Sequence, residues 1–291
     1  MRRQVATSVR DLLTDGAASR RAQPVPATAS RRSRDPGLFG PQSVTWRVHA
    51  DLSMLIGGVR ALFVQTLHPL AMAGVAEHSS YRTDPLGRLA RTGAFLATTT
   101  YGTSREAEQA IRRVRAVHRH VRGTAPDGRP YSATDPELLA WVHHVEVESF
   151  LVAYQRYGTG PRLAPEEADT YVEEMAAVAR RLGVPDPETT AAGLHERVAR
   201  QPDLRATSQA REAMRFLLVP PLPLAARPAY ALVAAAAIGL VPWRTRLALR
   251  LPSLPLADPV VVQPTVGVLL GALGWALGSN PALAAAQARC T

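Results

Sequence analysis

The chain has 291 residues and a formal net charge of +10, with 34 basic residues, all arginine, against 24 acidic ones. A composition that is 46% hydrophobic and 20% charged is typical of a globular protein and excludes a largely disordered one. Eight arginines but only two aspartates lie in residues 1–34, so most of the excess charge belongs to an N-terminal tail. The body is nearly balanced, and nucleic-acid binding is therefore not expected.

Cysteine usage limits the chemistry further. The single cysteine, Cys290, excludes a disulfide framework, a thiolate zinc site and covalent haem attachment through paired cysteines. Arg2 and Arg3 resemble the start of a twin-arginine export signal, but no apolar stretch follows them. We therefore expect a cytoplasmic location.

Residues 1–34 show no sustained hydrophobic period, which predicts a mobile tail that includes a short helix around Val9–Leu13. From Ser43 onward the pattern is that of consecutive helices without strand alternation. The sequence thus predicts an all-α fold, with one domain over residues 35–291. The helices expected in chain order cover residues 51–75 with a bend, 86–100, 103–122, 134–157, 165–182, 187–200 and 205–218.

The C-terminal third is the most apolar part of the chain. Ala229–Val241 is shorter than the ~20 residues that span a bilayer, and Val260–Leu277 only approaches that length. We expect both to be buried helices. The alternative is a membrane-associated hairpin, which would give the protein a peripheral membrane contact.

Two of the eight histidines lie on apolar helix faces. His118 shares a face with Ile111, Val114 and Val117, so it should be buried, whereas His120 points away. In the next helix, expected over residues 134–157, His143 lies on the face that points toward the core. The neighbouring His144 is expected to pair with Glu148, four residues further on.

The residue inventory fits haem better than a bare metal ion. There is no HExxH motif, and the core helices hold too few carboxylates for a di-iron site. A haem needs only one axial histidine, for which His118 and His143 are both candidates. Arg88 and Thr92 lie one helical turn apart and could bind a propionate and an oxygen-derived ligand; otherwise they are a surface arginine and a packing threonine.

Two glycine pairs lie inside apolar stretches rather than in phosphate-binding motifs. Gly57-Gly58 and Gly271–Gly274 suit close packing between helices. No GxSxG, GxxxxGK[ST] or GxGxxG motif is present.

An ordered series of motifs over about residues 35–250 resembles the MpaB-type oxygenases, which share their catalytic domain with the rubber oxygenase called latex clearing protein. No single motif is specific, but their order is. The series consists of Asp35-Pro-Gly-Leu-Phe-Gly-Pro41, Ser43-Val-Thr-Trp46, Gln65-Thr-Leu-His-Pro69, His78-Ser79, Asp84-Pro-Leu-Gly-Arg88, Arg91-Thr92, Tyr101-Gly102, Val117-His-Arg-His-Val-Arg-Gly123, Tyr131-Ser-Ala-Thr-Asp-Pro136 and Leu139-Ala-Trp-Val-His143.

The resemblance implies a globin-like helical domain that binds b-type haem. It implies His118 as the proximal iron ligand, with His143 as its rival, and it implies Arg88 and Thr92 beside the haem. Arg91 stands where rubber oxygenases can carry a lysine that ligates the iron, which arginine does not do. The nearest acidic candidate for a distal carboxylate is Glu77. His68 and His78 also match family positions, where their roles could be structural.

The function expected from this resemblance is a haem-dependent oxygenase that uses dioxygen on a small apolar substrate, such as an isoprenoid or a lipid. Two alternatives stay open. The first is a haem-binding sensor or carrier without turnover. The second is a cofactor-free, membrane-associated interaction protein that uses its apolar C-terminal third as an anchor.

Overall fold

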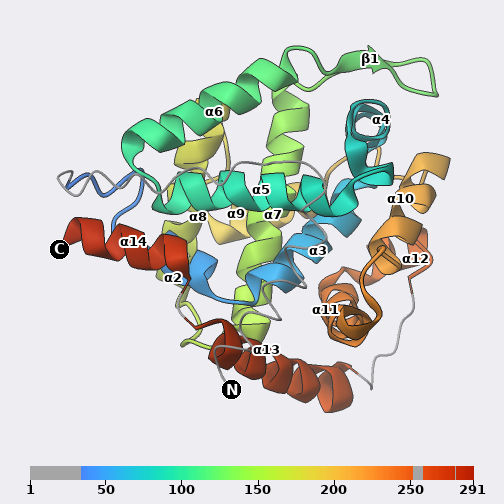
Figure 1. Ribbon diagram of the computed structural model, residues 1–291. Helices are drawn as coiled ribbons and strands as arrows, with labels where there is room; N and C mark the ends of the chain where they lie inside the picture. The colour runs from blue at the N-terminus through green and yellow to red at the C-terminus, as the bar shows by residue number, and fades with distance from the viewer. Residues whose placement is uncertain (1–33, 252–257, 279) are drawn as a thin grey trace.

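Apolar residues at helical spacing and prolines at helix starts shape nearly the whole chain. The computed structural model describes residues 34–251, 258–278 and 280–291, and its all-α architecture confirms the predicted class (Figure 1). The tail predicted for residues 1–33, with its helix around Val9–Leu13, lies outside the described residues. The α-helices are α2 (Val44–Ala50), α3 (Met54–Gln65), α4 (Pro69–His78), α5 (Pro85–Tyr101), α6 (Ser104–His118), α7 (Pro136–Tyr157), α8 (Pro165–Leu182), α9 (Ala191–Ala199), α10 (Ser208–Leu218), α11 (Arg227–Leu240), α12 (Trp243–Ala248), α13 (Gln263–Leu277) and α14 (Pro281–Cys290).

Helix starts are the best-predicted local feature. The side chains of Asp84, Thr103 and Asp135 each accept a hydrogen bond from a backbone N–H in the first turn of the helix that follows. The capping box expected at Thr103 and Glu106 is present. Gly183 ends α8 in a left-handed conformation, with φ of 116°.

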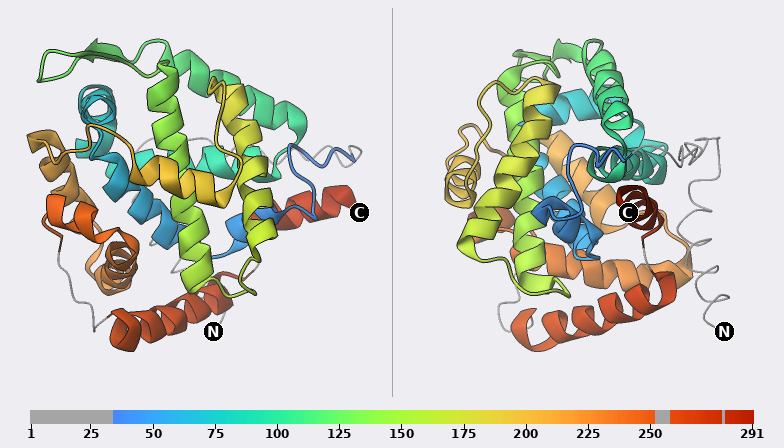
Figure 2. Two further views of the ribbon diagram at one scale, coloured as in Figure 1. Left: turned by 180° about the vertical axis from the view of Figure 1, so that it is seen from behind. Right: turned by 90° about the vertical axis from the view of Figure 1, so that its left-hand side faces the viewer.

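The central element is α7, which is surrounded by other helices (Figures 1 and 2). Its closest neighbour is α3, and a Cβ atom added to Gly57 would lie 2.8 Å from Phe150 Cδ1 and 2.9 Å from the Ser149 carbonyl oxygen. Gly57 is therefore required for the close approach of the two helices, as the sequence predicts. Added Cβ atoms at Gly271 and Gly274 would meet nothing within 4 Å and Leu52 at 3.7 Å, respectively, so the same prediction is wrong for that pair.

A buried ion pair joins α3 to α7. Arg60 is 2% exposed, and it donates hydrogen bonds to Glu148 at 2.9 Å, to Ser149 at 2.6 Å and to the Leu240 carbonyl at 3.1 Å. The second oxygen of Glu148 lies 2.8 Å from Nδ1 of His195 in α9. The predicted His144–Glu148 pair is wrong, because Arg60 and His195 occupy both carboxylate oxygens.

Two regions differ from the helices expected. The single bent helix predicted over residues 51–75 is two helices, α3 and α4, which meet at 106° just before Pro69. Proline disfavours helical backbone at the residue before it, and His68 is extended there.

The helix predicted to reach Arg122 ends at His118. The chain then forms an antiparallel hairpin of β1 (Arg122–Thr124) and β2 (Pro130–Ser132), which the sequence analysis missed. Gly123 pairs with Tyr131, and an added Cβ atom would lie 2.7 Å from the Tyr131 hydroxyl. The glycine expected to stop a helix is thus needed inside the hairpin.

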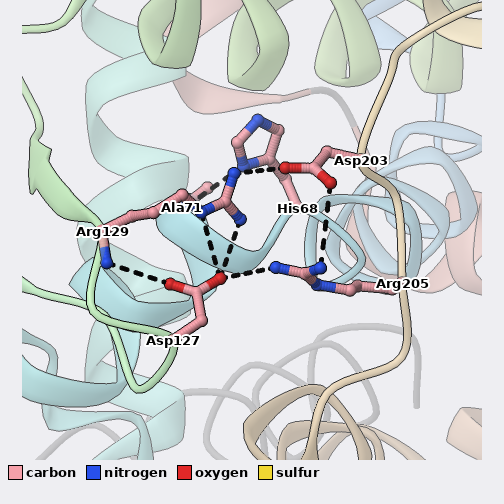
Figure 3. A network of polar contacts seen from close by, with 6 residues as sticks. All are labelled: His68, Ala71, Asp127, Arg129, Asp203 and Arg205. Carbon is pink, nitrogen blue, oxygen red and sulfur yellow. Dashed lines mark hydrogen bonds and ion pairs between the residues drawn. The ribbon is translucent and has the colours of Figure 1, made fainter.

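An exposed ion network fixes the tip of this hairpin to the loop before α10 (Figure 3). Asp127 pairs with Arg129 at 2.9 Å and with Arg205 at 2.5 Å, and Arg129 also pairs with Asp203. His68 lies beside the network and accepts a hydrogen bond from the Ala71 N–H at 3.4 Å.

The C-terminal third contains α11, α13 and α14. Val266 and Leu270 of α13 are buried in the same apolar cluster as α11 and α7, but most of α13 is not buried, so the prediction of a buried helix over Val260–Leu277 is wrong. The segment Val260–Leu277 is also long and apolar enough to cross a membrane, and only 17% of it is buried. Length and composition of a single helix are weak evidence for a membrane span.

Candidate functional site

Helices α5 and α6 form an antiparallel pair joined by a tight turn at Gly102 and Thr103. Arg88 lies thirteen residues before the end of α5, and His118 lies fourteen residues after the start of α6. At 1.5 Å per residue, both residues are about 20 Å from the turn. The fold therefore brings these two predicted site residues to the same end of the helix pair, toward which the helices spread apart in Figure 1.

Burial decreases along this pair from the turn to the far end. Tyr101, Ala107 and Ile111, near the turn, are buried, whereas Phe95 and Val114 are half-buried. Residues 91–94 of α5 are exposed. The far end of the pair thus lacks the apolar cover that the near end has.

His118 lies at the far end, on the buried face of α6. Its Nδ1 atom is buried, and neither ring nitrogen has a hydrogen-bond partner among the described residues. Burial lowers the pKa of His118, so the ring is neutral at pH 7 and one nitrogen keeps a free lone pair. His120 is exposed, as predicted, but Val117 is 57% exposed and does not belong to the apolar face assigned to it.

Arg88 is half-buried on α5. Its side chain makes no hydrogen bond or ion pair to the part of the chain that the structure describes. Burial lowers its pKa, nearby Arg91 lowers it further, and Tyr81 opposes the shift. A guanidinium in this position still carries its charge, and it is free to bind an anion.

The residues that flank Arg88 are already engaged. The Thr92 hydroxyl is exposed and donates to the Arg88 carbonyl at 3.2 Å, so the expected proximity of the two residues is present. Arg91 points to Asp84 and Ser80 at 3.3 and 2.7 Å. Arg91 therefore does not take the place of an iron-binding lysine.

Tyr81 is a candidate that the sequence analysis missed. Its hydroxyl is buried without a hydrogen-bond partner among the described residues, and it lies close enough to Arg88 for each to affect the other's pKa. Its pKa is raised, chiefly by burial. No local sequence pattern identifies this tyrosine, because Arg88 and Phe216, which lie near it, come from other segments of the chain.

His143 and Glu146 lie one helical turn apart on α7, and we call this pair the open face of α7. Neither makes a hydrogen bond or ion pair within the described residues, and both keep some accessible surface. Burial lowers the pKa of His143 to about 3, with a further contribution from His144. Burial alone raises the pKa of Glu146 to about 7.

Four helices surround this side of α7. Helices α2 and α8 pack against α7, α5 packs against α2, and α6 packs against α8. Neither α5 nor α6 packs closely against α7 in the described residues. Glu146 lies near Tyr171 of α8, whose hydroxyl is 3.1 Å from His49 Nε2. The arrangement separates the α5–α6 pair from α7, with α2 and α8 at the sides.

The other histidines and the expected carboxylate have partners or are exposed. His49 contacts Thr100 at 2.8 Å as well as Tyr171, and His144 accepts from the Glu188 N–H at 3.2 Å. Glu77 is exposed and accepts a hydrogen bond from Tyr131. No group of three or more histidine, cysteine or acidic side chains in the described residues could hold a metal ion by itself.

Two relatives, the uncharacterized proteins Mb2261 of Mycobacterium bovis and Rv2237 of Mycobacterium tuberculosis, are each 34% identical to the chain over 104 residues. The match covers 35% of this chain and 39% of each relative's length. No solved structure matches.

A family model described as "ER-bound oxygenase mpaB/B'/Rubber oxygenase, catalytic domain" matches residues 46–274. That range includes every residue of the open face, His118, Arg88 and Thr92. The chain therefore belongs to this family of oxygenase catalytic domains.

Proposed function

We propose that this protein is a haem b-dependent oxygenase that uses dioxygen on an apolar substrate of the unsaturated isoprenoid or lipid class. The observation that carries the proposal is a set of chemically competent groups without protein partners: His118, Arg88 and the open face of α7. Buried polar atoms in folded proteins are normally paired, so the unpartnered Nδ1 of His118 supports a bound molecule at this position.

The residues present fit a haem. The orphaned, neutral ring of His118 has the character of an axial ligand, and Arg88 is an unpaired cation that could neutralise a propionate. The half-buried apolar side chains of α5 and α6 would contact the porphyrin. Arginine does not ligate iron and the chain has no lysine, so histidine is left as the strong ligand at this site.

Each residue would have a defined task. His118 would hold the iron through one ring nitrogen, and His143 is the rival for that position. Arg88 would bind a propionate or an oxygen-derived anion, and Thr92 would offer a hydroxyl after release from the Arg88 carbonyl. When bound, haem would supply dioxygen activation at its iron.

Glu146 adds a proton-handling group to this set. A carboxyl with a pKa of about 7 can accept or release a proton at neutral pH. It replaces Glu77 as the acidic candidate, because the Glu77 carboxylate already accepts a hydrogen bond from Tyr131. We assign the substrate to an apolar class because the family that the chain belongs to includes rubber oxygenases.

The test is dioxygen consumption by the purified, haem-loaded protein with unsaturated isoprenoids and lipids, followed by product analysis. We expect substrate-dependent uptake that Arg88→Gln reduces by about tenfold or more. A protein that binds haem but consumes no dioxygen with any substrate of this class would be a sensor or carrier. A protein that neither carries haem nor can be loaded with it would rule out both haem-dependent functions.

A further inference from the structure

Exposed apolar side chains are concentrated in one stretch of the sequence. Thirteen large apolar side chains in the described residues are exposed, and nine of them lie between Leu218 and Trp275. Both exposed tryptophans, Trp243 at 63% and Trp275 at 51%, belong to this group. Single exposed apolar residues are normal on soluble proteins, but so many within one stretch of the chain are unusual.

Helix α13 contributes the most regular part of this surface. Val268 and Trp275 are spaced by seven residues, which places them on one side of the helix, and Val261 lies in the π-helical turn Asp258–Val262 just before it. All three are exposed. Val266 and Leu270 hold the opposite side against α7 and α11. The views in Figures 1 and 2 all place α13 along one edge of the molecule, with its outer side uncovered.

The charge around these side chains is one-sided. Residues 213–291 contain six arginines and a single acidic residue, Asp258. The lysine-free composition explains why the basic residues are arginines, but it does not explain why acidic residues are so rare here. Arg244 lies 5.4 Å from the centre of the Trp243 ring, so a cation and an exposed aromatic side chain occupy the same short helix, α12.

We propose that the C-terminal apolar surface, defined as Trp243 and Leu247 of α12, Val261 in the turn before α13, and Val268 and Trp275 of α13, docks onto the surface of an anionic phospholipid bilayer. Apolar and tryptophan side chains enter the interfacial region of a bilayer, and arginines bind its phosphate groups. A second copy of the chain fits less well, because it would oppose arginines with arginines. The inference concerns binding alone and does not depend on the proposed oxygenase activity.

The packing of α13 indicates how the helix would lie. A bilayer-spanning α13 would have to withdraw Val266 and Leu270 from the core cluster that they share with α7 and α11. Docking along the bilayer surface leaves that cluster intact and uses only side chains that are already exposed. We therefore infer a helix that lies in the plane of the membrane surface.

The apolar part of the surface is tested by co-sedimentation of the full chain with vesicles of phosphatidylcholine, with and without phosphatidylglycerol. We expect binding to the anionic vesicles and a loss of about tenfold or more in Val268→Asp. The matched control is Val117→Asp, because Val117 is also exposed and belongs to α6, on the opposite edge of the molecule in Figure 1. Thermal unfolding of both variants, followed by circular dichroism, checks that they are folded.

The electrostatic part is tested with Arg244→Gln/Arg250→Gln against Arg112→Gln/Arg119→Gln, which removes the same charge from exposed positions on or next to α6. The first pair should weaken binding on the order of tenfold, and the second should not. Raising the salt concentration from about 0.1 M to 1 M should weaken binding of the wild-type protein.

Four results would overturn the proposal: no binding of the wild-type protein, equal binding of Val268→Asp and Val117→Asp, equal binding to neutral vesicles, or resistance to extraction at alkaline pH, which indicates a spanning helix. A wild-type dimer that Val268→Asp converts to a monomer would also overturn it, in favour of a second copy of the chain.

Discussion

Glu146 and Glu148 of helix α7 lie two residues apart in opposite environments. Glu148 is 3% exposed, and both of its oxygens are engaged, one by Arg60 and the other by His195. Glu146 has neither a hydrogen bond nor an ion pair within the described residues, and its pKa is raised to about 7. One carboxylate closes a network within the protein, whereas the other remains available for a proton or a bound molecule.

The difference separates structural from functional polar groups on one helix. A buried ion pair with complete hydrogen bonding joins α3, α7 and α9, and its removal would leave an uncompensated charge. An unpaired titratable group with a perturbed pKa is characteristic of a functional site. The side chains of His118 and Arg88 also lack partners within the described residues, so they are candidates for a functional role for the same reason as Glu146.

The largest expected effect on stability comes from breaking the buried ion pair of Arg60 and Glu148. Glu148→Gln leaves the buried guanidinium of Arg60 without a counter-ion and should lower the free energy of unfolding by about 3–5 kcal/mol. The isosteric change Glu146→Gln breaks no pair and removes a carboxyl group that is costly to ionise, so it should not lower the free energy of unfolding at neutral pH. Denaturant unfolding at neutral pH measures both, and equal losses would refute the distinction.

The contribution of Glu146 to the stability of the protein should depend on pH. The folded-state pKa of Glu146 is raised from 4.5 to about 7, so the folded protein retains this proton longer than the unfolded chain does. The contribution of Glu146 is fully present below pH 4.5 and is lost as the pH rises through about 7, by up to about 3 kcal/mol.

Buried histidines with lowered pKa values shift stability in the opposite direction over part of this range. The quantity to measure is therefore the difference in unfolding free energy between the wild-type protein and Glu146→Gln from pH 4 to 8. We expect the wild-type protein to lose stability relative to the variant as the pH rises. A difference that does not vary with pH would show that Glu146 has an ordinary pKa.

Packing should differ between the paired side and the α5–α6 pair. Gly57→Ala forces an extra methyl group against Phe150 and Ser149 and should destabilise the protein by about 1–3 kcal/mol. Gly93→Ala in α5 meets no atom within 4 Å. This control should be neutral or stabilising by up to about 1 kcal/mol, because alanine favours helix more than glycine does. Thermal unfolding distinguishes them, and a destabilising Gly93→Ala would show that α5 is more tightly packed than described.

The smallest effect concerns the exposed network at the hairpin tip. Asp127→Asn removes the partner shared by Arg129 and Arg205, and should lower the melting temperature slightly at low salt and not at 1 M salt. The pKa of Asp127 is lowered by its hydrogen bonds with Arg129, so its contribution is present above pH 3.8 and is lost on acidification. A large effect that persists in high salt would place this network with the buried pair instead.

The sequence predicts what local chemistry decides. Capping residues at Thr103 and Asp135 define the starts of α6 and α7, and helical periodicity places His118 on the buried face of α6. The Gly57 contact is also predictable, since a glycine inside an apolar helix indicates close packing. The one-domain organisation expected for residues 35–291 stays a prediction.

Long-range pairing is not predictable in the same way. Arg60 and Glu148 are 88 residues apart, and nothing near Glu148 reveals that Arg60, rather than His144, is its partner. A lone arginine in the apolar stretch of α3 does indicate that some carboxylate must meet it. The hydrogen bond from Tyr131 to Glu77 could not be predicted for a related reason, because the hairpin that carries Tyr131 was itself missed.

We propose that the unpartnered side chains, with His118 as the iron ligand, form a haem site. The most direct measurement is the Soret absorption of the protein, His118→Ala and His143→Ala, each titrated with haem. We predict that the wild-type protein and His143→Ala give the same band with stoichiometric binding, and that His118→Ala loses it. A full-strength band in His118→Ala, or no band in the wild-type protein, would contradict the account.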